Sequence, residues 1–134
     1  MRIPIVERDD RSASFFDAAA QRKLVIKRCP NCAVYGPPRQ RHCGRCGAEM
    51  TWSQANGEAR LVTWTASPAK KGDEDETPFG YVELAEGPWL ETLLIDLPID
   101  ARQPGTLMQV TFLHPDGGES VPAFIAKTSR LAGD

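Results

Sequence analysis

The chain has 134 residues, of which 41% are hydrophobic and 25% charged, and its formal net charge is −2. This size and composition fit one globular domain or two small ones. No apolar run is long enough to cross a bilayer, and the N-terminal stretch MRIPIVERDD lacks the continuous apolar segment of a secretory signal. We therefore expect a cytoplasmic protein without membrane association, in which thiols stay reduced.

Charge is distributed unevenly along the chain. Residues 1–50 hold ten Lys and Arg against five Asp and Glu, for +5, whereas residues 51–134 hold six against thirteen, for −7. Seven basic residues and no acidic ones lie between Gln21 and Ala48. This stretch could form an anion site, but we favour the alternative that it compensates the negative charge of a metal bound by thiolates.

The first predicted element is a short helix between about Arg11 and Lys23. Ser12 or Ser14 can cap its N-terminus by accepting a backbone N–H. Its apolar stripe would consist of Phe15, Phe16, Ala19 and Ala20. A helix of about three turns is marginal on its own, so the stripe should pack either on the rest of the chain or on a partner protein.

All four cysteines follow a strand-like stretch, LVIKRC, and form two Cys-x-x-Cys pairs: Cys29/Cys32 and Cys43/Cys46. Two such pairs supply four thiolates to one tetrahedral metal, so we predict a structural zinc site, with iron as the alternative. Gly47 gives the second pair a permissive backbone. His42 could replace a thiolate as ligand, but we favour a surface position for it.

This cysteine arrangement argues against three kinds of catalysis. A thioredoxin-like pair would need a βαβ context, which the sequence does not show. A catalytic zinc would keep a coordination position open for water, but four cysteines fill all four. A cysteine nucleophile needs a free thiolate, and zinc leaves none.

Residues 51–134 read as short strands with no convincing helix. The five candidates are RLVTWTAS, FGYVEL, WLETLLIDL, GTLMQVTFL and VPAFIAK. Five strands in this length fit a small closed barrel such as an OB fold. In the first strand we expect Val62, Trp64 and Ala66 on one face, opposite Leu61, Thr63 and Thr65. The charged stretch PAKKGDEDETP should form a solvated loop after it.

The same region shows little catalytic equipment. His114 lies in the turn HPDGG, and no phosphate-binding Gly-rich loop, Gly-x-Ser-x-Gly elbow or His-Glu-x-x-His motif is present. Six aromatic residues could stack on single-stranded nucleic acid: Trp64, Phe79, Tyr81, Trp89, Phe112 and Phe124. We expect them in the barrel core instead, and a charge of −7 disfavours phosphate binding. An independent nucleic-acid-binding protein stays the alternative function.

The order of motifs resembles the family of small zinc-ribbon plus OB-fold proteins that are associated with acyl-CoA enzymes, a domain of unknown function. The resemblance runs from about Ser12 to Ala126 through SFFDAAAQRKL, CPNC, GPPR, CGRC, GEARLVTWTAS, PFGYVELAEG and LETLLIDL. Ala33 departs from the pattern, because glycine is common after the second cysteine. The fold it implies is mainly β, with an N-terminal arm and helix (1–23), a rubredoxin-like zinc ribbon (24–50) and a five-stranded OB-fold barrel (51–134).

The resemblance also implies a function. Family members look like non-catalytic accessory subunits of thiolase-superfamily enzymes, which make or break carbon–carbon bonds on acyl-CoA thioesters. We therefore expect no enzyme activity from this chain alone, and a hetero-oligomer with a thiolase, retro-aldolase or acyltransferase. The chain would shape the entrance for the CoA thioester, where Arg39, Arg41 and Arg45 would meet CoA phosphates.

Overall fold

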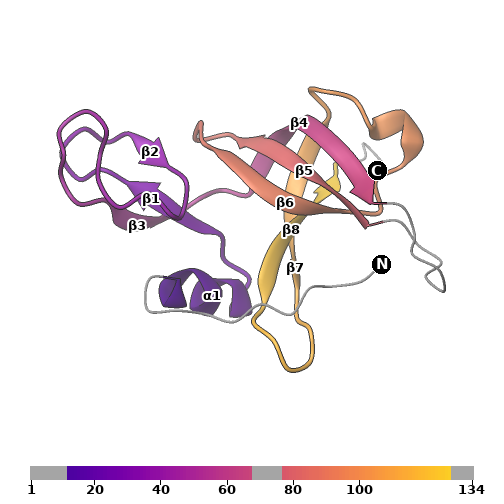
Figure 1. Cartoon of the computed structure of the whole chain (residues 1–134), viewed down its shortest axis with the longest axis horizontal. Helices are drawn as coiled ribbons and strands as arrows, with labels where there is room; N and C mark the ends of the chain where they lie inside the picture. Colours follow the sequence, from indigo (N-terminus) through magenta and orange to yellow (C-terminus); the bar gives the residue numbers. More distant parts are fainter. Residues whose placement is uncertain (1–11, 68–76, 128–134) are drawn as a thin grey trace.

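The structure is a computed structural model that describes residues 12–67 and 77–127. A three-stranded ribbon sheet and a closed five-stranded barrel follow one another along the chain, with an N-terminal helix beside both (Figure 1). The elements are α1 (Ala13–Ala20), β1 (Val25–Arg28), β2 (Tyr35–Gly36), β3 (Thr51–Gln54), β4 (Glu58–Ser67), β5 (Thr77–Leu84), β6 (Trp89–Ile95), η1 (Ile99–Ala101), β7 (Leu107–Leu113) and β8 (Val121–Ala126). The predicted mainly-β fold class is confirmed. Most of the predicted charged loop, residues 68–76, lies outside the described residues.

Helix α1 is shorter than predicted and packs on its own chain. Ser12 is its N-cap residue, but the side chain makes no capping hydrogen bond. Phe16 is 8% exposed and Ala19 1% exposed, whereas Ala20 lies at the surface. Phe15 packs edge-on against Phe16 and joins the partly buried rim of the core. Because α1 contacts β1 and β8, its apolar stripe is used inside the molecule.

The ribbon sheet has the order β2-β1-β3, and both pairs are antiparallel. Ile26 of β1 is fully buried and belongs to the same hydrophobic cluster as the barrel core. Its neighbour Lys27 lies between Gly36 and Trp52 in the register. Strand β3 begins at Thr51, the predicted first residue of the barrel domain, yet it pairs with β1. The division of the chain into domains therefore stays a prediction.

The barrel has the order β4-β5-β6-β8-β7 and closes through the pairing of β4 with β7. Its neighbours are antiparallel except β6 and β8, which run parallel. The five predicted strands and the predicted closed barrel are therefore confirmed. Among the described residues, no helix has the length and apolar character that spanning a bilayer requires.

The predicted faces of β4 are wrong because the strand contains a β-bulge. Leu61 pairs with Val82 and Thr63 with Tyr81, so the register shifts at Val62. Leu61 is 1% exposed and Trp64 packs against the same core, which puts residues from both predicted faces inside. An extra residue in one strand produces such a change of face.

Glycine at position 80 lets the bulged strand approach β5 closely. Gly80 pairs with Trp64, and a Cβ atom at position 80 would collide with the backbone carbonyl of Thr63. Only a residue without a side chain fits at this point.

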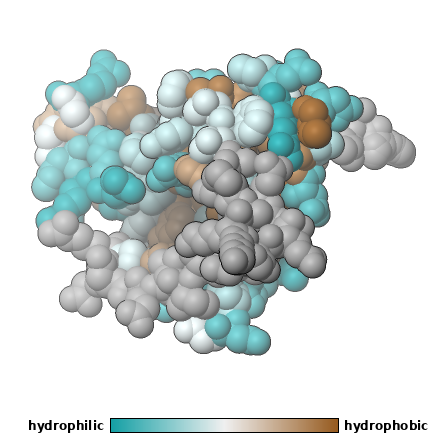
Figure 2. All heavy atoms as spheres, turned by 45° about the vertical axis from the view of Figure 1, so that its right-hand side comes forward, coloured by the Kyte–Doolittle hydropathy of each residue, from teal (hydrophilic) through white to brown (hydrophobic). Residues whose placement is uncertain are grey.

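Ribbon and barrel share one core at their junction. Leu24, Ile26 and Ala55 cluster with the barrel residues Leu61, Val82, Leu84, Leu94, Met108 and Phe124. On the face presented in Figure 2, the hydrophobic side chains of the described residues surface in small areas between hydrophilic ones. The apolar side chains are thus gathered mainly inside, which ties the ribbon to the barrel.

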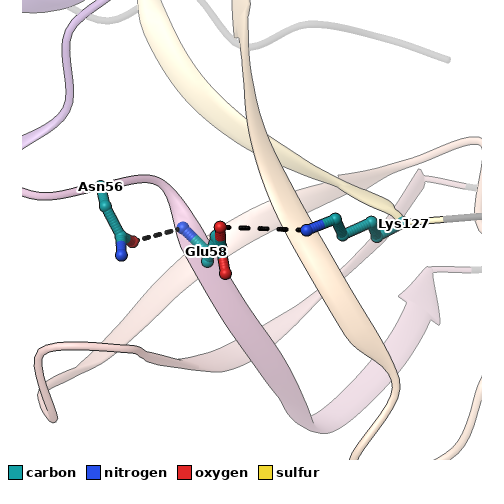
Figure 3. A network of polar contacts seen from close by, with 3 residues as sticks. All are labelled: Asn56, Glu58 and Lys127. Carbon is teal, nitrogen blue, oxygen red and sulfur yellow. Dashed lines mark hydrogen bonds and ion pairs between the residues drawn. The ribbon is translucent and has the colours of Figure 1, made fainter.

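Polar contacts also lie at the junction, and Figure 3 shows those that link Asn56, Glu58 and Lys127. The backbone N–H of Asn56 donates to the Glu86 carboxylate at 2.8 Å, and its side-chain oxygen accepts from the N–H of Glu58 at 2.8 Å. The Glu58 carboxylate lies 3.9 Å from the Lys127 ammonium. This ion pair is exposed and contributes little, so the two hydrogen bonds carry most of the polar stabilisation.

Candidate metal centre and the basic surface around it

The four predicted cysteines come together in one cluster. Their sulfur atoms all lie within 4.8 Å of one another. The first pair lies between β1 and β2 and the second between β2 and β3, so the ribbon sheet brings them face to face. Cys29 and Cys43 are buried, Cys32 is half-buried and Cys46 is exposed. Within the described residues, no other group of three or more potential metal ligands forms.

The two cysteine pairs repeat the same backbone hydrogen bonds. The N–H groups of Cys29 and Cys43 donate to the carbonyls of Val34 and Ala48, each at 2.8 Å. Backbone N–H groups also donate to sulfur at 3.3 Å in both pairs: Cys32 N–H to Cys29 Sγ, and Arg45 N–H to Cys43 Sγ. Donors aimed at sulfur stabilise the thiolate form, which metals bind.

Each repeat ends in a residue with left-handed backbone. Gly47 has φ +78° and Ala33 has φ +60°, and the N–H groups of both donate to the carbonyl of the first cysteine in their pair at 2.9 Å. The predicted role of Gly47 is confirmed. Position 33 has the same left-handed conformation, which glycine adopts without strain. Alanine costs about 1 kcal/mol more in this region.

Hydrogen bonding shifts the pKa values of the thiols in opposite directions. The backbone N–H of Arg45 lowers the pKa of Cys43 to about 7, and the N–H of Ala48 lowers the pKa of Cys46. The hydrogen bond with the Cys46 sulfur raises the pKa of Cys32 to about 12. The thiolate form is therefore favoured at Cys43 and Cys46 and disfavoured at Cys32, where a bound cation would stabilise it.

The donor set fits one zinc ion held by Cys29, Cys32, Cys43 and Cys46. Four thiolates complete a tetrahedral shell, so bound zinc would stabilise the ribbon and leave no position for substrate. His42 is exposed and lies outside the cluster, in a β-bridge with Glu49. The four cysteines alone therefore account for the site.

The predicted CoA-contacting arginines lie at the surface, and their contact with CoA stays a prediction. Arg39, Arg41 and Arg45 are all exposed. Burial lowers the pKa of Lys27. The carboxylate of Glu49 raises this pKa, and the guanidinium of Arg41 lowers it. Within the described residues, no hydrogen bond or ion pair links Arg39 or Arg45 to Lys27 or Arg41. Arg41 thus interacts electrostatically with Lys27, a residue that the sequence analysis did not single out.

Lys27 is held by two contacts on the ribbon sheet. Its ammonium donates to the Gln40 carbonyl at 3.2 Å and lies 4.5 Å from the centre of the Trp52 ring. Lys27 and Trp52 face each other across β1 and β3, which explains the cation–π contact. Sequence reasoning could have found the pair only by predicting β3 and its register.

His114 lies in the connection between β7 and β8, as the turn HPDGG predicted. Its Nδ1 atom is 2.7 Å from Ser120 Oγ. Both residues belong to the same connection, so the contact stabilises the loop.

Two family models match adjoining parts of the chain. Residues 16–51 match the rubredoxin-like zinc ribbon domain of ChsH2, and residues 52–113 match its C-terminal OB-fold domain. The chain belongs to the ChsH2 family. The predicted resemblance, zinc ribbon and OB fold are thereby confirmed, and zinc is the metal that this ribbon domain is named for.

One solved structure agrees with this ChsH2 assignment, and a second has the same fold. The "Ltp2-ChsH2(DUF35) aldolase" contains a chain that is 29% identical, with a TM-score of 0.75 over 92% of this chain and 98% of that chain. A DUF35-family protein of unknown function from Sulfolobus solfataricus is 14% identical, with a TM-score of 0.62 over 88% and 86% of the two chains. This second likeness shows the fold alone.

One curated relative of this ChsH2-family chain is longer. The "Probable enoyl-CoA hydratase alpha subunit" of Thermomonospora curvata is 30% identical over 125 residues. The match covers 90% of this chain and 38% of the relative. The chain therefore spans less than half the length of that relative, which has further sequence of its own.

Proposed function

We propose that this chain is a non-catalytic accessory subunit of a thiolase-superfamily complex that makes or breaks carbon–carbon bonds on acyl-CoA thioesters. The observation that carries the proposal is the match to the ChsH2-containing aldolase, which spans 98% of that chain and 92% of this one. The two chains therefore correspond over most of the length that was compared. An accessory role in the same kind of assembly is the simplest function for such a pair.

The chemistry of the described residues supports a non-catalytic role. All four cysteines belong to the metal cluster, so a bound metal leaves no thiol free to attack a thioester. Burial lowers the pKa of Lys27 on the ribbon sheet, and the other pKa shifts given above belong to three of these cysteines, Cys32, Cys43 and Cys46. The partner subunit would supply the nucleophile and the acid–base groups. The proposal includes a cytoplasmic location, where reduced thiols can bind metal.

Co-expression with the Ltp2-like subunit of the same genome tests the proposal. We expect one complex to elute in size-exclusion chromatography with light scattering, at the summed mass of its subunits. Retro-aldol cleavage of a β-hydroxyacyl-CoA should appear with the complex and be absent with this chain alone. Turnover by the isolated chain, or two subunits that elute separately at micromolar concentration, would contradict the proposal.

The hydratase name of the longer relative favours a second candidate, in which the partner is an enoyl-CoA hydratase. Only 38% of that relative corresponds to this chain, so its remaining part could supply the hydratase chemistry. The same co-expression with a hydratase-like subunit, assayed by hydration of a 2-enoyl-CoA, distinguishes the two candidates. A complex with the hydratase and none with the Ltp2-like subunit would favour the second.

The exposed arginines offer a test of the CoA entrance. Replacing Arg39, Arg41 and Arg45 together by alanine should weaken CoA binding to the complex by about tenfold, because charge-assisted hydrogen bonds to phosphate are lost. Isothermal titration with CoA measures the effect. A control that removes equal charge from exposed positions elsewhere, Arg22, Lys23 and Arg60, should leave affinity unchanged. Equal affinities for the wild-type complex and the first variant would exclude these contacts.

A further inference from the structure

Two large aromatic side chains lie exposed beside each other on the barrel. Trp89 of β6 is 54% exposed and Tyr81 of β5 is 40% exposed. Their ring centres are 6.4 Å apart, with the planes tilted by 48°. Both were predicted to be core residues, which is wrong. Exposed Trp and Tyr are typical of interface hot spots, because each ring offers a large apolar area with few torsions to fix.

The strand register shows what surrounds the two rings. Tyr81 pairs with Glu91, and Trp89 pairs with Glu83, so each ring has a carboxylate opposite it on the neighbouring strand. One row further along, the half-buried Phe79 pairs with Leu93. Residues at alternate positions of β5 share one face of the sheet, and Gly80, Val82 and Leu84 between them are buried. The outer face of β5 and β6 is therefore an aromatic and apolar surface with two carboxylates.

The two carboxylates are available for a cation. Glu83 and Glu91 are exposed, and neither forms an ion pair within residues 12–67 and 77–127. Arg60 pairs with Glu83 in the register, but its guanidinium donates to the Gly105 carbonyl at 3.4 Å. A guanidinium can stack on an aromatic ring and bind a carboxylate at the same time, which an uncharged or acidic group cannot do.

The charge also decides between two kinds of occupant. β5 and β6 are the second and third strands of the barrel, the face on which OB folds bind oligonucleotides. Single-strand binders combine stacking rings with a basic groove. Here the groups beside the rings are Glu83 and Glu91, which repel phosphate. The rings are suited to stacking, but the two carboxylates favour a cationic protein surface over a nucleic acid as the group on which they stack.

We propose that Tyr81, Trp89, Glu83 and Glu91 form a docking site for an arginine-bearing segment of the partner subunit. The inference rests on the proposed function, because it assigns part of the interface of the proposed complex. The rings supply the apolar contact, and the carboxylates select a cationic partner and speed its association.

The experiment measures binding of the intact chain to the Ltp2-like subunit of the same genome by biolayer interferometry. Trp89→Ala and Tyr81→Ala should each raise Kd by about 30-fold, mainly through faster dissociation. The double variant Glu83→Gln, Glu91→Gln should slow association and flatten its dependence on salt. Ile99→Ala is the control, because Ile99 is 81% exposed on η1, outside the surface. It should leave Kd unchanged. Thermal unfolding checks that each variant folds.

Three results would overturn the inference. If the wild-type complex forms and the aromatic variants bind equally well, the surface is not the docking site, although the proposed function stands. An increase in Kd as large for Ile99→Ala would show that the effect is not specific to this surface. Salt-dependent binding of a mixed single-stranded oligonucleotide that is lost in Trp89→Ala would assign the face to nucleic acid. Absence of any wild-type complex would reject both the proposed function and this inference.

Discussion

Replacing Cys29 by serine should abolish tight zinc binding and unfold the ribbon sheet, while the barrel stays folded. Cys29 is fully buried and belongs to the small ribbon core, whose other buried members are Cys43 and Met50. Two of these three residues are also metal ligands, so little apolar packing is left around the cysteines without the metal. Structural zinc contributes about 10–16 kcal/mol to the folding of small zinc-finger peptides. The hydrophobic contacts of the ribbon cannot replace a term of that size.

Zinc content by mass spectrometry and amide hydrogen exchange of separate peptides measure this result. Peptides from residues 25–54 should lose their protection in Cys29→Ser, whereas peptides from residues 79–126 should keep it, because their hydrogen bonds belong to the barrel. His42→Ala is the control next to the second pair, and it should retain stoichiometric zinc. Stoichiometric zinc and full protection in Cys29→Ser would mean that another group completes the site.

The metal centre could be predicted from sequence because its geometry is local. A two-residue spacing brings both sulfurs of a pair to one side of a tight turn, and the conformation of Gly47 follows from the same turn. The strand faces could not be predicted in this way. The bulge at Val62 depends on Gly80, which is far along the chain and admits the backbone of β4. Alternation within one strand holds no information about such a contact.

The aromatic residues show the same limit. Phe124 is fully buried, as expected, and Trp64 and Phe112 pack against the core. Tyr81 and Trp89 are exposed instead, because the register turns their positions on β5 and β6 outward. Hydrophobicity alone suggested a core role for all of them. An exposed aromatic pair becomes visible only when the strand pairing is known, and it then points to binding.

Contacts between distant segments were also beyond sequence reasoning. The Trp64 indole donates to the Arg102 carbonyl at 3.0 Å, and the Arg102 guanidinium lies 5.2 Å from the Trp64 ring. Arg102 follows η1, a short helix that was not predicted. A helix of three residues gives a periodic signal that is too weak to recognise in a sequence. Both η1 and the contact between Trp64 and Arg102 therefore depend on the folded barrel.

Replacing Phe124 by alanine should lower the free energy of unfolding of the barrel by about 3–5 kcal/mol. Phe124 is fully buried in β8, between Leu94 of β6 and Val110 of β7 in the strand register. Removing the ring forfeits its transfer free energy and leaves a cavity that three hydrogen-bonded strands cannot close by moving. Urea unfolding followed by tryptophan fluorescence measures the change.

The next residue along β8 provides the matched control. Ile125 is half-buried and pairs with Ile95 and Gln109, and alternation along the strand turns its side chain to the opposite face from Phe124. Ile125→Ala should therefore cost about 1 kcal/mol, because the site is open to water and no closed cavity forms. Equal losses in the two variants would show that the ring of Phe124 is not the centre of the barrel core. A loss for Phe124→Ala with an unchanged slope against urea would locate the effect in the folded barrel, since the slope reports the surface exposed on unfolding.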